Sequence, residues 1–114
     1  WLKAQALAVM TLESQVLARA AGLSLGRVSI GDPRSRWGSC TAEGDLRYSW
    51  RLIMAPSHVR RATVAHEVAH LRHMDHSPAF HAFVDELHDG EVSAARHWLR
   101  THGRDLHRYR FDGR

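Results

Sequence analysis

Two histidines and a glutamate stand together in the segment His66-Glu67-Val68-Ala69-His70, which matches the pattern H-E-x-x-H. Residues four apart lie on one face of a helix, about 6 Å apart along its axis, so the two imidazoles can bind one Zn²⁺. Glu67 lies beside them and can reach a zinc-bound water without becoming a ligand, as a general base must. The alternative is a hydrogen-bonded pair of core histidines, which is costly to bury in so apolar a segment. We therefore predict a catalytic metal site.

A catalytic zinc needs a third protein ligand, and His76 is the best candidate. It follows His70 by six residues, the offset of the last histidine in the longer pattern H-E-x-x-H-x-x-G-x-x-H. His73 stands where that pattern has glycine, and histidine tolerates the left-handed conformation better than most residues. Ser77-Pro78 then forces the chain out of the helix, because a residue before proline avoids the α region. We predict that His76 binds the metal and that His73 lies at the surface.

Other side chains have weaker claims on the same site. The alternative third ligands are Glu86 and Glu91. The carboxylates that can accept an N–H from a ligand imidazole are Asp75, Asp85 and Asp89. The groups that can stabilise a developing oxyanion are Arg36, Tyr48, His81 and His97. The single cysteine, Cys40, is interpreted as a small buried residue rather than a ligand.

Helices and short strands must position these residues. Apolar spacing of three and four predicts a helix over residues 2–21, and Gly22 ends it. Alternating apolar residues predict a strand over 26–32 and a β-hairpin formed by 36–41 and 46–53. The sheet is therefore expected to be small and three-stranded, antiparallel or mixed.

The helix that carries H-E-x-x-H begins at Pro56-Ser57 and is apolar on nearly all sides, so it should lie centrally. Ser77-Pro78 starts a third helix, because serine caps and proline suits the first helical position; this helix ends by Gly90. A fourth covers residues 92–102 and ends at Gly103. The fold class is thus α+β, with about four helices.

Length and composition describe an ordinary globular chain. The 114 residues, 44% of them apolar, suit one domain spanning 1–114. A single cysteine excludes an intrachain disulfide, and no apolar run approaches the roughly 20 residues of a membrane span. We expect a cytoplasmic monomer that makes no membrane contact. Because the sequence starts at Trp1, we also expect it to be the C-terminal part of a longer protein.

Several motifs in order resemble the YgjP-like metallopeptidase family. They are Ser35-Arg36-Trp37-Gly38-Ser39-Cys40, Trp50-Arg51-Leu52-Ile53 with Ala55-Pro56, His66-Glu67-Val68-Ala69-His70-Leu71, and His76-Ser77-Pro78 with Phe80. The resemblance implies a zincin-like fold, one zinc held by His66, His70 and His76, and Glu67 as catalytic acid/base. Ser49, Asp75 and His81 depart from the residues usual in the family, which bears on substrate contacts.

The leading function is zinc-dependent hydrolysis of a peptide or protein substrate, by Glu67-assisted attack of a zinc-bound water. One alternative is a zinc-dependent nucleotide phosphoanhydride hydrolase. The chain has a net charge of +4, and nearly all of its cationic residues are arginines. In that case arginine side chains would make the phosphate contacts or bind nucleic acid weakly. The residues concerned are Arg34, Arg36, Arg47 and Arg51. The other alternative is a DNA-associated protease or binding module of SprT-like type.

Overall fold

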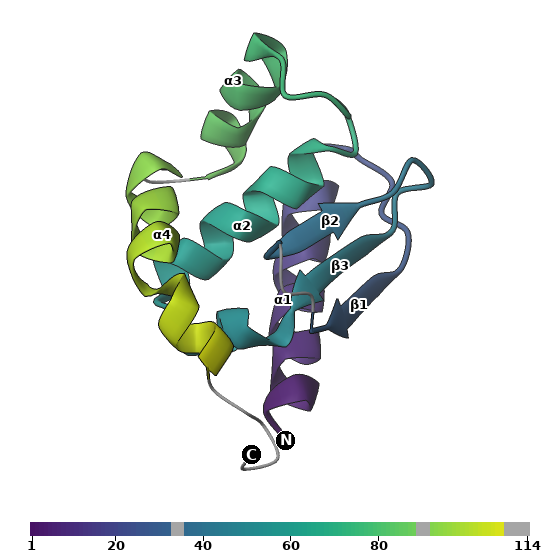
Figure 1. Ribbon diagram of the computed structural model, residues 1–114. Coiled ribbons are helices and arrows are strands. Elements are labelled where there is room, and N and C mark those ends of the chain that lie inside the picture. Colours follow the sequence, from purple (N-terminus) through teal and green to yellow (C-terminus); the bar gives the residue numbers. More distant parts are fainter. Residues whose placement is uncertain (33–35, 89–91, 109–114) are drawn as a thin grey trace.

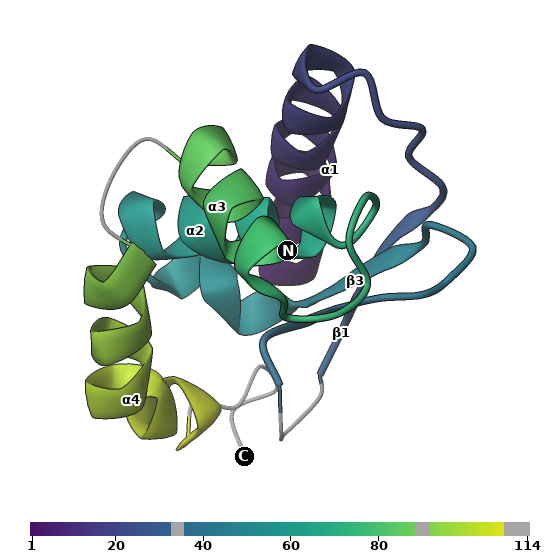
Figure 2. The same cartoon turned by 90° about the horizontal axis from the view of Figure 1, so that it is seen from above.

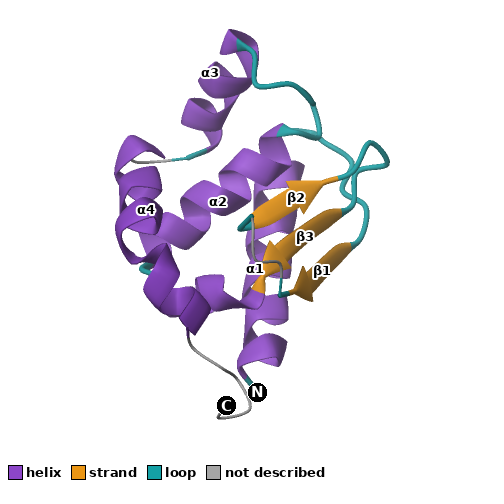
Figure 3. Cartoon of the chain, in the orientation of Figure 1, coloured by secondary structure: helices purple, strands orange, loops and turns teal. Residues whose placement is uncertain are grey.

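The computed structural model describes residues 1–32, 36–88 and 92–108 (Figure 1). The elements, in chain order, are α1 (Leu2–Ala20), β1 (Val28–Gly31), β2 (Gly38–Cys40), β3 (Leu46–Ser49), the 3₁₀ helix η1 (Trp50–Met54), α2 (Ser57–Ala69), α3 (Pro78–Leu87) and α4 (Val92–Arg108). Helices and a small sheet are both present, so the predicted α+β fold is confirmed (Figure 3). None of the described helices is long and apolar enough to cross a membrane.

The sheet is mixed, with the strand order β1-β3-β2. β3 pairs antiparallel with β2, where Gly38 lies opposite Tyr48, so the predicted hairpin is confirmed. β1 joins the other side of β3 in parallel, with Val28 opposite Leu46. The sheet therefore has its last strand in the middle, and β2 forms one edge.

The prediction that the second hairpin strand runs to Ile53 was wrong. β3 ends at Ser49, whose hydroxyl accepts a hydrogen bond from the backbone N–H of Arg51 at 3.3 Å and so starts η1. Trp50 and Leu52 are nevertheless buried in the core, but so is Arg51 between them. The apolar alternation therefore predicted that Trp50 and Leu52 enter the core, but it did not predict the 3₁₀ turn, in which consecutive residues are buried.

α2 occupies the centre of the molecule, as predicted. It packs against α1 and the sheet on one side and against α3 and α4 on the other (Figures 1 and 2). Its valines and alanines fill three adjoining apolar clusters, which explains why the segment is apolar on nearly all sides. The H-E-x-x-H residues are therefore carried by the most buried helix of the fold.

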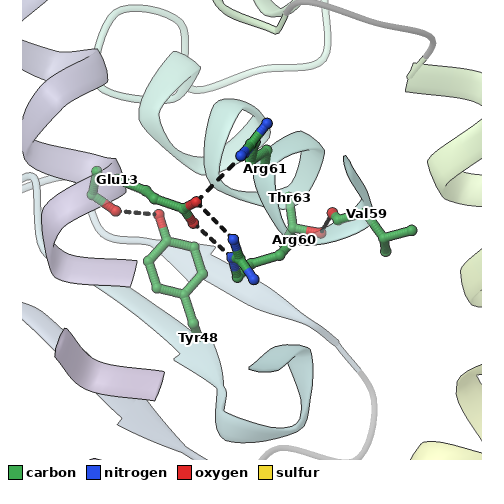
Figure 4. Close-up of polar contacts among 7 residues, drawn as sticks. Glu13, Tyr48, Val59, Arg60, Arg61 and Thr63 are labelled. Carbon is green, nitrogen blue, oxygen red and sulfur yellow. Dashed lines mark hydrogen bonds and ion pairs between the residues drawn. The ribbon is translucent and has the colours of Figure 1, made fainter. Parts of the chain in front are cut away.

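Polar contacts fix α1 to α2 and the sheet (Figure 4). The Arg60 guanidinium donates from Nε and Nη2 to the two carboxylate oxygens of Glu13, at 2.9 and 3.0 Å. Arg61 lies 3.7 Å from the same carboxylate. The hydroxyls of Ser14 and Tyr48 form a buried hydrogen bond of 2.9 Å. These contacts hold the N-terminal part of α2 in place, at the end of the helix away from the histidines.

The ends of the last two helices were predicted with mixed success. Ser77 caps α3 as expected, since its hydroxyl accepts a hydrogen bond from the Phe80 N–H at 3.2 Å. α4, in contrast, does not end at Gly103 but continues to Arg108. A Cβ on Gly103 would lie 2.8 Å from Cζ2 of Trp37, so this glycine allows the indole to pack closely against the helix. Its lack of a side chain serves packing rather than termination.

Candidate metal centre

Three histidines converge at the C-terminal end of α2. His66 lies on the helix, His70 directly follows its last residue, and His76 comes from the connection to α3. One ring nitrogen of each lies within 4.8 Å of those of the other two, and the ring centroids are 5.0–5.4 Å apart. The structure thus brings the three predicted ligands together in a group that can hold a metal ion.

The connection after α2 turns the chain back without a left-handed residue. Backbone N–H groups of His70 and Leu71 bond three residues back, to the carbonyls of Glu67 and Val68, at 3.1 and 3.0 Å. No described residue other than glycine has a positive φ, so the expectation of a left-handed His73 was wrong. A tightened last turn does the work of the glycine in the longer pattern.

Each of the first two histidines is oriented by a neighbour. Nδ1 of His70 lies 2.9 Å from the carbonyl oxygen of His73 and donates to it, which leaves Nε2 as the lone-pair atom. The buried Phe80 ring of α3 stacks on His70 at 4.4 Å and meets the edge of His66 at 4.9 Å. The ring of His73, half-buried, packs on Phe83 at 6.0 Å, outside the cluster. A backbone carbonyl and Phe80 thus supply support that the sequence analysis assigned to carboxylates.

Burial keeps two of the imidazoles neutral. Together with smaller contributions from the neighbouring His70 and Arg96, it lowers the pKa of His66 to about 4. Burial also lowers the pKa of His70, against the opposing effect of its bond to the His73 carbonyl. Neutral imidazoles are the form that binds a metal ion, so at neutral pH two of the three donors are ready for it.

Glu67 lies beside the cluster but does not belong to it. The residue is only 5% exposed, and burial raises the pKa of its carboxyl to about 7, while the Arg36 guanidinium acts in the opposite direction. Its side chain rests on β2, where a Cβ on Gly38 would come within 2.9 Å of both Cγ and Oε2. Gly38 therefore makes room for the carboxylate, a role that the sequence analysis did not assign.

The histidine cluster opens onto a cavity of about 260 Å³ that runs along the edge strand β2. Its walls are the three histidines and Glu67 on one side and Gly38, Ser39 and Cys40 of β2 on the other. Cys40 donates its thiol proton to the Thr41 carbonyl, with sulfur and oxygen 3.4 Å apart, and burial raises the thiol pKa to about 11. The cysteine is thus a protonated wall residue outside the ligand cluster, as interpreted from the sequence, but it is half-buried rather than buried.

The remaining accessory candidates are spread over the molecule. Tyr48 is fully buried and bonded to Ser14, so its hydroxyl does not face the cluster. His81 lies 6.4 Å from His76, ring to ring, and Arg36 lines the cavity.

Exposed positions outside the cavity are occupied by Asp85, Glu86 and His97. Asp75 is also exposed and accepts a hydrogen bond from the Ser77 N–H at 3.4 Å. Three predicted residues lie outside the described ranges: Arg34, Asp89 and Glu91.

The arginines proposed for phosphate binding do not converge either. Arg47 lies over Gly31, on the sheet. Arg51 is buried and forms an ion pair with Asp32. Arg36 lies near His66 and Glu67, in the lining of an adjoining cavity to which Arg96 of α4 also contributes. Arg96 was not predicted from the sequence. Nothing in the local sequence marks Arg96, because its role depends on how α4 packs against α2.

A histidine pair on a buried helix, a third donor from the next connection and a protected carboxylate beside them place the chain among the metallohydrolases. The chain belongs to the YgjP-like family, described as a metallopeptidase domain, whose model matches residues 1–102. No curated protein and no solved structure is significantly similar to it.

Proposed function

We propose that this domain hydrolyses peptide bonds with one Zn²⁺ held by His66, His70 and His76. Three imidazole nitrogen donors and no oxygen donor suit zinc, and three protein ligands leave a position open for water. When bound, the ion would supply Lewis acidity toward a water molecule and the substrate carbonyl. Membership of a metallopeptidase family supports a peptide rather than another substrate.

The observation that carries the proposal is the position of Glu67. A metal that served only structure would have no use for a buried carboxylate that stands next to the ligands without joining them. With a pKa near neutrality, Glu67 can accept the proton of the attacking water and pass it to the leaving nitrogen. Arg36 and His81, the two oxyanion candidates near the cluster, would face the developing negative charge.

An extended substrate has a surface on which to lie. β2 pairs with β3 on one side, and its residues form the wall of the cavity opposite the histidines. A peptide added along this edge would gain backbone hydrogen bonds and carry one carbonyl past the cluster. Edge strands are otherwise covered or charged in native proteins, and β2 carries no charged residue.

A mixed assay tests the proposal. The zinc-loaded protein is incubated with a defined peptide mixture and, in parallel, with nucleoside triphosphates, each with and without a chelator, and products are identified by mass spectrometry. We expect peptide cleavage that stops with chelator and returns with zinc. Release of pyrophosphate or phosphate without peptide cleavage would favour the phosphoanhydride alternative instead. Zinc binding with neither reaction, together with DNA binding, would favour the binding module.

A further inference from the structure

A second cavity adjoins the proposed reaction site. It has a volume of about 240 Å³ and lies between the segment that leads into β2, the middle of α2 and the face of α4. Four residues line both cavities: Arg36, Gly38, His66 and Glu67. A group bound in the second cavity would therefore sit next to the reacting bond, because Glu67 and His66 line both cavities.

The lining of this second cavity is mostly apolar, with two exposed cationic side chains. Ala62 and Ala95 are its buried members, and Val92, Leu99 and Trp37 contribute further apolar surface. Two exposed guanidiniums, Arg36 from the sheet side and Arg96 from α4, complete the lining. The cavity is smaller than the 300–1,000 Å³ typical of sites for whole organic ligands, so it suits a single residue of a longer chain.

Arg36 and Arg96, the two arginines of this lining, form no ion pair with a carboxylate in the described part of the molecule. The ion pairs there join Arg51 to Asp32 and both Arg60 and Arg61 to Glu13, and neither cavity arginine takes part. The one acidic side chain in the lining is Glu67, which the proposed function already uses. Two arginines that flank an apolar slot beside a reaction centre are an arrangement for recognising a planar anion, because guanidinium groups bind carboxylates through charge-assisted hydrogen bonds.

We propose that this cavity is a specificity pocket that selects a carboxylate on the substrate residue next to the cleaved bond, with Arg96 and Arg36 as its receptors. The carboxylate belongs either to an acidic side chain or to the free C-terminus of the substrate. The inference rests on the proposed peptidase function, since it names the substrate feature that the same centre would read.

The test compares matched peptides with the zinc-loaded protein. One series carries Glu, Gln or Leu on either side of the cleaved bond, and a second ends in a free acid or an amide. We expect kcat/KM to be about 10- to 100-fold higher for the carboxylate member of one series, the value of hydrogen bonds to a charged group. The series in which this preference appears identifies the source of the carboxylate. The preference should shrink as salt rises, because both arginines are exposed.

Variants of α4 locate the effect. Arg96→Gln should reduce the preference to about twofold, because one of the two charged receptors is lost, and Arg96→Glu should favour Lys in place of Glu. Arg100→Glu is the matched control, because it makes the same charge change one turn along the same exposed helix but outside the cavity lining. Cleavage without any carboxylate preference, or equal effects of Arg96→Glu and Arg100→Glu, would overturn the pocket assignment.

A binding measurement separates this inference from the peptidase function. Zinc-loaded Glu67→Gln protein, which should bind peptides without cleaving them, is titrated with the Glu and Gln peptides by calorimetry. The titration is repeated with the double variant that also carries Arg96→Gln. Carboxylate-dependent binding that needs Arg96, together with an inactive parent, would support the pocket and contradict the peptidase. If the protein showed no turnover and no carboxylate-dependent binding, both the peptidase function and the pocket would be contradicted.

Discussion

The molecule holds two protected glutamates, both next to the side of α2 that packs against α1 and the sheet, and their surroundings differ. Glu13, at the interface of α1 and α2, receives two hydrogen bonds from Arg60 and a longer contact from Arg61. Glu67, between α2 and β2, is 5% exposed and rests on a glycine, with a guanidinium near enough to influence it but none within 4.0 Å among the described side chains.

The difference separates a structural carboxylate from a reactive one. A charge that is fully paired contributes to holding two helices together. A charge that burial leaves underpaired is costly in the folded state, and its raised pKa expresses that cost. Such a group is retained where its proton affinity has a use, as in general base catalysis.

The largest expected effect is that of Glu67→Gln. The amide keeps the size and hydrogen-bonding capacity of the side chain but removes the base, so turnover of any true substrate should fall by about 10²–10⁴. Zinc content by elemental analysis and the melting temperature should stay near or above those of the parent. Loss of the metal would make Glu67 a ligand, and full activity would place the base elsewhere.

The next largest effect concerns the loop donor. His76→Ala should weaken zinc affinity by about 100-fold or more, since it removes one of three proposed ligands, while His73→Ala should change it by less than about tenfold. Competition with a chromogenic chelator measures both. His73 is a matched control because it lies in the same connection and packs on Phe83 outside the cluster. Equal losses would refute the choice of third ligand.

At the interface of α1 and α2 the expected loss is in stability. Glu13→Gln leaves the Arg60 fork without its charged partner and should lower the free energy of unfolding by about 1–2 kcal/mol, measured by urea denaturation. Zinc affinity and kcat should be unaffected, which is the reverse of the Glu67→Gln result. If Glu13→Gln lowered kcat at a temperature well below its melting point, the contrast between the two glutamates would fail.

A smaller effect on turnover is expected from Gly38→Ala. The added methyl group would meet the end of the Glu67 side chain, which can move, so the fold should lose little stability. The displaced carboxylate should nevertheless reduce kcat by about tenfold, because a base misplaced by a fraction of an ångström transfers protons poorly. Gly103→Ala is the comparison: it also crowds a neighbour, Trp37, but should affect melting temperature more than turnover.

The smallest effect is in the acid response of the metal-free protein. His66 has a folded pKa of about 4, below its ordinary value, so its contribution to stability is present above about pH 6.5 and is lost as pH falls toward 4. Glu67 has a folded pKa of about 7, above its ordinary value, so it favours the folded state more as pH falls from 7 to 4.5. The two slopes oppose each other. In chelator, Glu67→Gln should therefore lose melting temperature more steeply than the parent between pH 6.5 and 5; parallel curves would contradict the raised pKa.

The sequence revealed what depends on local spacing. His66, Glu67 and His70 follow from helical geometry. Ser77-Pro78 starts α3 as predicted, but it does not end the preceding helix, because α2 already ends at Ala69. Partners that tertiary packing brings together carry no such signal. Arg96, Gly38 under Glu67, Phe80 against the imidazoles and Trp37 on Gly103 come from different elements, and no pattern along the chain connects them. The strand predicted through Ile53 failed for a related reason: Arg51 is buried together with Trp50 and Leu52, and it is paired with Asp32, which is distant in the sequence.

The order of strands in the sheet has a consequence for synthesis of the chain. β1 and β2 both pair with β3, yet β3 is the last of the three in the sequence. On the ribosome, both outer strands therefore emerge before the strand that satisfies their backbone groups, and neither can pair natively until residues 46–49 have left the exit tunnel. During that interval they are open edges of the kind that attracts other chains. The hairpin then forms across a short loop, while β1 must close the longer distance from Val28 to Leu46. Correct assembly of the wall that faces the histidines thus waits on the late arrival of the central strand.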